Sequence, residues 1–412
     1  MESPKDRVIL HCDCNGFFAS VETLLDPSLA EVPMVVTGDP ESRHGIILAK
    51  NEKAKKYGIQ TAETIWQAKQ KCPKLVCVLP HHDMYGKISK QVNAIYLDYT
   101  DLVDPFGIDE SFLDITGSLR LFKKTPKELA DDIRERVRRE IGITISVGVS
   151  FCRVFAKLGS DYKKPDATTV IDRNNFREIA YPLPVGALLF AGRRTVEALN
   201  KMGILTIGDL AAADRHAITA RLGEGGDTLW RYASGLDDEP VRTYWDRPAP
   251  KSVGNGMTFR RDIAGIEEIR AGVMALTDSV AARLREADRK CTVVQVQIKD
   301  PNFRTVQKQC TLKRATWLRQ ELTATAMELI RAAVGFGSSI RALTVTAAGL
   351  VARGDTEEQL DMFSCNGAGE QEKQESVEKT LADIRHKHGK ASIRLGCYEN
   401  AEIGTDKSRK WD

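Results

Sequence analysis

The sequence lacks the features that mark membrane proteins, zinc ribbons and disulfide-rich proteins. It has no run of 18 apolar residues, and its first residues, MESPKDR, are polar, so we expect neither a transmembrane helix nor a secretory leader. Its nine cysteines form no C-x-x-C pair, and the closest two are Cys12 and Cys14. This spacing argues against a zinc ribbon or a disulfide framework. These absences predict a soluble, cytoplasmic protein that has reduced thiols and no membrane contact.

A large overall charge is also missing, because 60 Lys and Arg nearly balance 57 Asp and Glu and leave a net charge of +3. The charge is unevenly placed, however. Residues 247–353 hold 18 Lys and Arg against 9 Asp and Glu. A basic block inside a near-neutral protein is typical of a domain that binds a polyanion, although an ordinary basic surface has the same composition.

At 412 residues the chain is too long for one ordinary domain. Up to about residue 171 strand and helix patterns follow each other in mixed order, which predicts an α+β sheet domain covered by helices on one face. Residues 182–239 predict short helices joined by glycine turns. The expected order over residues 252–353 is β-α-β-β-α-β, and a charged helix is expected over residues 370–387.

The segment VDPFGIDESFLDITG, residues 103–117, places Asp109 and Glu110 side by side in an apolar, β-prone stretch. Adjacent carboxylates repel each other and oppose burial. Neighbours in a regular strand point to opposite faces, but Gly107 allows a turn or bulge through which both carboxylates converge. Asp13, at the end of the strand VILHCDC, supplies a third carboxylate if the two strands are adjacent. Such a cluster suits Mg²⁺, whereas an isolated Asp-Glu pair is ordinarily a solvated turn.

A further candidate is LNKMGILTIGDLA, residues 199–211, which has the spacing of a helix–hairpin–helix. In that motif the glycine turns the chain so that backbone N–H groups at a helix start meet a DNA phosphate without reading the bases. A plain helical hairpin has the same pattern, so both interpretations stay open at this point.

Three segments, HCDCNGFFASVE, GIDESFLDI and SVGVSFCRVFAKLGSDYKKPD, occur in this order. With the domain order, they resemble a bacterial Y-family translesion DNA polymerase of the DinB, or DNA polymerase IV, type over about residues 7–353. The resemblance implies a polymerase right hand of palm, fingers and helical thumb, plus a β-α-β-β-α-β little finger. The implied boundaries are palm 1–16 and 80–171, fingers 17–79, thumb 172–239, linker 240–251, little finger 252–353 and C-terminal tail 354–412.

The resemblance implies a DNA-directed DNA polymerase that performs error-prone translesion synthesis on primer–template DNA with dNTPs, without proofreading. In this reaction the primer 3′-oxygen attacks the dNTP α-phosphate, and two metal ions stabilise the attacking and leaving oxygens. Asp13 and Asp109 would hold both Mg²⁺ ions, and Glu110 would complete the ion that activates the 3′-hydroxyl. The resemblance makes the backbone carbonyl of Cys14 a further ligand.

The resemblance also implies nucleotide contacts. Lys164, in YKKPD, matches a lysine that reaches the triphosphate, and Lys55, in NEKAKKYG, stands at a basic phosphate contact, with a plain surface lysine as the alternative. Phe17 and Phe18 are assigned to nucleotide binding, with Phe18 at the steric gate that excludes a ribose 2′-hydroxyl and one of the two rings in the core.

The sequence departs from several relatives near the triphosphate. Ala49 and Glu52 stand where those relatives carry a Thr and a Tyr hydroxyl on the phosphates, and Asn15 replaces a common Asp. Ile46 and Leu48 share one face of the strand GIILA, above the expected nascent base pair, where some relatives carry alanines. Because of these differences, the sequence does not decide which residues contact the phosphates. The three acids are not affected by them.

In the tail, the peptide EEQLDMF resembles the short motif by which bacterial polymerases dock on the sliding clamp, through Gln359, Leu360, Met362 and Phe363. A linker with some apolar residues is the alternative.

We expect a monomer. Two other functions compete: a non-catalytic DNA-binding or regulatory protein with a polymerase fold, and a nucleotide cyclase. The presence of all three acids argues against the first, and the basic C-terminal domain argues against the second.

Overall fold

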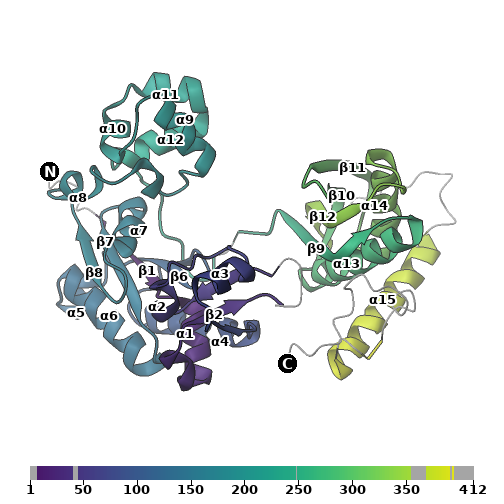
Figure 1. The fold of residues 1–412 in the computed structure, drawn as a ribbon, viewed down its shortest axis with the longest axis horizontal. Coiled ribbons are helices and arrows are strands. Elements are labelled where there is room, and N and C mark those ends of the chain that lie inside the picture. Colours follow the sequence, from purple (N-terminus) through teal and green to yellow (C-terminus); the bar gives the residue numbers. More distant parts are fainter. Residues whose placement is uncertain (1–6, 40–44, 247, 354–367, 390–391, 394–412) are drawn as a thin grey trace. The chain divides into compact units, whose positions relative to one another are not determined.

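The computed structural model describes residues 7–39, 45–246, 248–353, 368–389 and 392–393 (Figure 1). The chain divides into two compact units, residues 1–247 and 248–412. Within the described ranges, no helix combines the length and the apolar character needed to cross a membrane.

Five strands form the central sheet of the first unit: β1 (Ile9–Cys14), β5 (Val103–Pro105), β6 (Glu110–Asp114), β7 (Ile145–Ser150) and β8 (Thr168–Ile171). Their order across the sheet is β5-β6-β1-β7-β8. Strand β1 pairs antiparallel with β6 on one side and with β7 on the other, whereas β7 and β8 are parallel. The expected pairing of the strand that ends near Asp13 with the strand after Asp109 is therefore present.

The helices around this sheet are α1 (Phe17–Leu25), α4 (His82–Leu97), α5 (Leu119–Phe122), α6 (Pro126–Ile141) and α7 (Arg153–Tyr162). Leu10 and Cys12 of β1 pack into one core with buried residues of α4 and α6. Helix α7 lies on the opposite face, where Ala156 packs against Ile9. The prediction of helices on one face is therefore wrong for α7, because the parallel pair β7–β8 needs a crossover helix and this crossover covers the second face.

Helix α7 approaches β7 closely at Gly148. A Cβ on Gly148 would lie 1.8 Å from the carbonyl oxygen of Ala156 and 2.4 Å from the backbone nitrogen of Ser160. Only glycine leaves room for this contact between backbones. The close approach places the turn of α7 that carries Lys157 and Ser160 directly over β1.

A smaller sheet follows α1 in the sequence. Its strands and the short helices around it are η1 (Pro27–Glu31), β2 (Met34–Thr37), β3 (Ile47–Lys50), α2 (Glu52–Lys55), α3 (Ile65–Lys71) and β4 (Val76–Val78). Strand β2 is central, antiparallel to β3 and parallel to β4. Ile47 is buried, whereas Ile46 just before β3 is 39% exposed and Leu48 is half-buried. The pairing of β2 with β3 skips Leu48, which marks a bulge, so the alternation of the GIILA segment is not regular and the shared face of Ile46 and Leu48 stays a prediction.

The rest of the first unit is helical: α8 (Phe176–Ala180), η2 (Val185–Ala187), α9 (Arg193–Lys201), α10 (Ile207–Ala212), α11 (Arg215–Leu222) and α12 (Glu224–Ala233). Gly203, with φ of 79°, makes the turn between α9 and α10. Thr206 and Asp209 form a capping box at the start of α10. These side chains accept hydrogen bonds from N–H groups at the helix start. The helix–hairpin–helix interpretation had left N–H groups at a helix start available to a DNA phosphate.

The second unit contains β9 (Ser252–Ile263), α13 (Ile266–Glu286), β10 (Arg289–Lys299), β11 (Thr305–Thr316), α14 (Arg319–Ala333) and β12 (Ile340–Ala352). The strands form an antiparallel sheet ordered β11-β10-β12-β9. Alternate residues of β10, Val294 and Val296, join the same core as Leu276 of α13 and Leu322 of α14. The predicted β-α-β-β-α-β order is confirmed (Figure 1).

Helix α15 (Ala368–His388) packs on the second unit through polar contacts. Glu378 accepts a hydrogen bond from the Arg285 guanidinium and another, at 2.9 Å, from the N–H of Arg319, the first residue of α14. It thereby caps a helix start that has no side-chain cap of its own. The ion pairs that join α15 to the unit are Arg285–Glu378, Lys290–Glu375 and Arg385–Asp278.

Candidate active site

Three acids meet at the paired ends of β1 and β6. Asp13 lies directly opposite Glu110 in the antiparallel register. Asp109 comes just before β6, so the alternation of a regular strand does not force its side chain away from that of Glu110. The N–H of Cys14 donates to the carbonyl of Asp109 at 2.9 Å, which ties Asp109 to the end of β1.

Gly107 makes the turn that lets the acids converge. The N–H groups of Phe106 and Gly107 donate to the carbonyl of Glu110 at 3.0 and 3.1 Å. A Cβ on Gly107 would lie 3.1 Å from Cγ of Glu110 and 3.3 Å from Oδ1 of Asp109. Both carboxylates therefore lie against this position, and a larger residue would push on them.

Two lysine ammonium groups contact the acids. Lys157 Nζ lies 3.0 Å from Oδ2 of Asp13 and 2.8 Å from Oε2 of Glu110. Lys164 Nζ lies 2.8 Å from Oδ1 of Asp13, and both lysines also contact Asp161, at 3.3 and 2.7 Å. The site is thus a compact network in which acidic and basic groups alternate.

The pKa values reflect this arrangement. Burial raises the pKa of Asp109, and the charges of Asp13 and Glu110 raise it further. Burial acts in the same direction on Glu110, but His11 and the Lys157 ammonium outweigh it and lower the pKa of Glu110 to about 2. For Lys157, the attraction of Asp13 and Glu110 overcomes burial and raises the pKa. An acid cluster that stabilises neighbouring positive charge so strongly suits a metal ion.

An aromatic group lies at the start of α1, which follows β1 after two residues. Phe17 is 2% exposed and belongs to the core, so its ring is not available to a ligand. Phe18 is half-buried and stacks on Tyr85 of α4, with ring centroids 4.2 Å apart and planes 12° apart. The hydroxyl of Tyr85 donates to the buried carboxylate of Glu22, which also accepts from the ring of His81. These contacts hold the Phe18 ring in one orientation.

Comparisons with known proteins assign the chain to a family. The model of the impB/mucB/samB family matches residues 12–161, and that of the impB/mucB/samB family C-terminal domain matches residues 250–362. DNA polymerase IV of Acetivibrio thermocellus is 44% identical over 390 residues, which span 95% of this chain and 97% of that protein. The chain belongs to the DNA polymerase IV family.

Further relatives agree with this assignment. DNA polymerase IV of Bacillus anthracis is 36% identical over 396 residues, covering 96% of this chain and 94% of that protein. DNA polymerase IV 1 of Bacillus subtilis is 33% identical over 95% of this chain and 93% of that protein. A solved Y-family DNA polymerase chimera has the same fold, with a TM-score of 0.73, 20% identity, and coverage of 84% of this chain and 99% of the chimera. The resemblance to a Y-family polymerase is thus confirmed.

The structure brings some of the expected site residues of this DNA polymerase IV homologue together and leaves others apart. Lys164 joins the acid cluster. Cys14 is buried, and burial raises the pKa of its thiol, so only its backbone is suited to metal binding. Lys55 is exposed, and its ammonium pairs with Glu52 at 3.3 Å on its own helix. The clamp-type peptide, residues 359–363, lies outside the described residues.

Four residues of this site were not predicted from the sequence: His11, Lys157, Ser160 and Asp161. Lys157 and Asp161 stand four residues apart on α7, so helical spacing could have placed them on one face. His11 shares a face of β1 with Asp13, and its Nδ1 lies 2.8 Å from Oγ of Ser160. No local pattern shows that α7 crosses this face of β1, which is why sequence reasoning missed the contacts.

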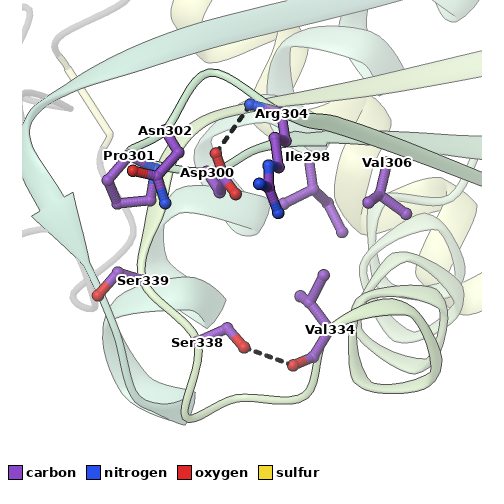
Figure 2. A pocket seen from close by; sticks show the side chains of 9 residues that line it. All are labelled: Ile298, Asp300, Pro301, Asn302, Arg304, Val306, Val334, Ser338 and Ser339. Carbon is purple, nitrogen blue, oxygen red and sulfur yellow. Dashed lines mark hydrogen bonds between the residues drawn. The ribbon is translucent and has the colours of Figure 1, made fainter.

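A hollow of about 390 Å³ lies on the second unit (Figure 2). It is lined by Ile298, Asp300, Pro301, Asn302, Arg304, Val306, Val334, Ser338 and Ser339. The carboxylate of Asp300 accepts the backbone N–H of Arg304 at 2.8 Å, and the hydroxyl of Ser338 donates to the carbonyl of Val334 at 2.6 Å. The single carboxylate in the lining of this hollow thus accepts a hydrogen bond within a turn. We therefore take the acid cluster of the first unit, and not this hollow, as the candidate active site.

Proposed function

We propose that this DNA-directed DNA polymerase extends primers on damaged and undamaged templates by metal-assisted nucleotidyl transfer at Asp13, Asp109 and Glu110. The convergence of these carboxylates at the ends of β1 and β6 supports the proposal. The primer 3′-oxygen attacks the dNTP α-phosphate and pyrophosphate leaves. Bound metal ions supply the positive charge that stabilises the attacking and leaving oxygens.

The donor set fits a hard divalent cation. Two partly buried ammonium groups, those of Lys157 and Lys164, already lie on the carboxylates, so the cluster attracts more than one positive charge. Mg²⁺ prefers oxygen ligands and commonly keeps waters and substrate phosphates. We infer two Mg²⁺ ions, held by the three acids and by the backbone carbonyl of Cys14.

The nucleotide would lie between the lysines and the aromatic group. Lys164 is poised to exchange the carboxylate of Asp13 for a triphosphate oxygen, and Lys55 would give up its surface pairing with Glu52 to do the same. Phe18, fixed by its stack on Tyr85, would lie beneath the sugar and exclude a 2′-hydroxyl. Phe17 would contact the nucleotide through its backbone only, since its ring is in the core.

DNA binding would use both units. Helix α9 begins at Arg193, its N-cap Gly192 offers no side-chain hydrogen bond, and Arg193 and Arg194 lie in its first turn. A helix start without a side-chain cap, beside two cations of which Arg193 pairs with Glu197, favours a backbone phosphate there, in place of the capped start of α10. The basic excess of residues 247–353 would add phosphate contacts. We further propose that the enzyme acts as a cytoplasmic monomer and docks on the sliding clamp through residues 359–363.

Primer extension on a defined template tests the proposal. Asp109→Ala and Glu110→Ala should each abolish Mg²⁺-dependent extension while primer–template binding persists, because these acids hold metal rather than DNA. The exposed Asp83→Ala, on α4, is the matched control and should extend normally. Activity within about threefold of wild type in either active-site variant would contradict the metal assignment.

A further inference from the structure

A buried histidine lies behind the acid cluster. His11 has 0% exposure, and its ring packs edge-on against Phe112 with centroids 4.6 Å apart. Its Nε2 lies 3.3 Å from Oε2 of Glu110 but has no hydrogen-bond partner in the described structure. Because nearly all buried polar atoms in native proteins are paired, an unpaired nitrogen aimed at a catalytic carboxylate points to a role in the site.

Ser160 determines which ring nitrogen carries the hydrogen. Its Oγ lies 2.8 Å from the carbonyl of Lys157 and 2.8 Å from Nδ1 of His11, and a hydroxyl has one hydrogen to donate. If Ser160 donates to Lys157, Nδ1 carries the ring hydrogen and Nε2 turns a lone pair toward Glu110. If Ser160 donates to His11, the hydrogen lies on Nε2 and faces Glu110.

We propose that His11 is a positioning residue for Glu110, acting through an Nε2–H···Oε2 hydrogen bond that Ser160 enforces by turning its hydroxyl hydrogen from the carbonyl of Lys157 to Nδ1. This inference rests on the proposed metal function of the acids. The Lys157 ammonium holds Oε2 of Glu110 at 2.8 Å in this structure. When a metal ion takes over the role of that positive charge, His11 is the donor within reach that can keep the same oxygen in place.

Outer groups of this kind orient metal ligands, and their loss typically costs about 10–100-fold in metal affinity. His11→Asn keeps an amide near the Nδ1 position but removes the group that faces Glu110. His11→Gln restores an N–H close to the Nε2 position. We therefore expect about tenfold weaker metal binding in His11→Asn, near-wild-type binding in His11→Gln, and an intermediate value in Ser160→Ala.

The test titrates Mn²⁺ into the complex of full-length enzyme with primer–template DNA before any dNTP is added. Free Mn²⁺ is followed by electron paramagnetic resonance, so the readout does not depend on turnover. DNA affinity and thermal unfolding are measured for each variant, and DNA affinity should stay at the wild-type value. Wild-type Mn²⁺ affinity in His11→Asn would overturn the inference, as would equal weakening in His11→Asn and His11→Gln.

Asp109→Ala separates this inference from the proposed function. If Asp109→Ala loses Mn²⁺ binding and His11→Asn does not, the metal site stands and the role of His11 is refuted. If Asp109→Ala binds Mn²⁺ as wild type does, the proposed metal site itself fails. If His11→Asn does not fold, Ser160→Ala is the deciding variant. Wild-type Mn²⁺ affinity in Ser160→Ala would show that the hydroxyl does not enforce the hydrogen bond from His11 to Glu110, and would refute the inference.

Discussion

Replacing Lys157 by Met should destabilise the metal-free first unit and make its stability depend on divalent cations. The ammonium bridges Asp13 and Glu110 at 3.0 and 2.8 Å. Methionine keeps much of the side-chain volume but leaves Glu110 without its ammonium partner, while Asp13 keeps Lys164. A divalent cation can replace the lost charge, so Mg²⁺ should restore more stability to the variant than it adds to the wild type.

The pKa of Glu110 bounds the size of the effect. The pKa falls from 4.5 to about 2. This shift corresponds to about 3 kcal/mol of stabilisation of the charged carboxylate, since one pKa unit is about 1.4 kcal/mol. His11 contributes to this fall, and solvent screens a partly exposed carboxylate, so we expect Lys157→Met to cost about 2 kcal/mol. That corresponds to a decrease in Tm of roughly 4–8 °C for a domain of this size.

The pH dependence has a definite sign. Because the folded-state pKa of Glu110 is lowered, the stabilisation is fully present above pH 4.5 and is lost as the pH falls toward about 2. The variant should therefore differ from wild type at neutral pH and approach it in acid. The measurement is thermal unfolding in EDTA and in millimolar Mg²⁺, with the exposed Lys163→Met as control. Equal Tm values for variant and wild type in EDTA, or equal gains from Mg²⁺, would refute the reasoning.

Four further outcomes are expected. Phe18→Ala should raise the ratio of ribonucleotide to deoxynucleotide incorporation, and an unchanged ratio would show that this ring is not the gate. Gly148→Ala should cost about 3 kcal/mol or more in unfolding experiments, because its Cβ would meet a carbonyl oxygen at 1.8 Å; Gly86→Ala, in open space on α4, is the control, and similar stabilities would contradict the close packing. DNA affinity should fall steeply with salt for all sequences alike, and a salt-independent affinity would contradict binding through phosphates. Replacing Leu360 and Phe363 by Ala should abolish stimulation by a loaded sliding clamp and spare extension of short primers at high enzyme concentration, and full stimulation would mean that the peptide is only a linker.

Local sequence determined much of the secondary structure. Helix α6 illustrates this: Thr125 and Glu128 form a capping box, Pro126 is its first residue, and Gly142 ends it with φ of 87°. Each of these residues acts on the backbone within one turn, so no distant contact is needed to place the helix.

The choice of Asp13, Asp109 and Glu110 as candidate metal ligands also came from the sequence. Asp13 ends an apolar strand, and Asp109 and Glu110 interrupt another beside a glycine. Carboxylates are costly in such positions unless a ligand or counter-charge compensates them, so their presence indicates function. The sequence could not give their arrangement, because the register of β1 with β6 depends on pairing residues about 100 positions apart.

The surroundings of the acids were decided by tertiary structure alone. The crossover between β7 and β8 puts α7 on the face of β1 that carries Asp13, and Gly148 lets it approach closely enough for Lys157 to bridge two acids. The same packing seals His11 under the site. Helix periodicity shows which residues of α7 share a face, but the partner of that face is set by long-range burial and strand order, which no short stretch of sequence encodes.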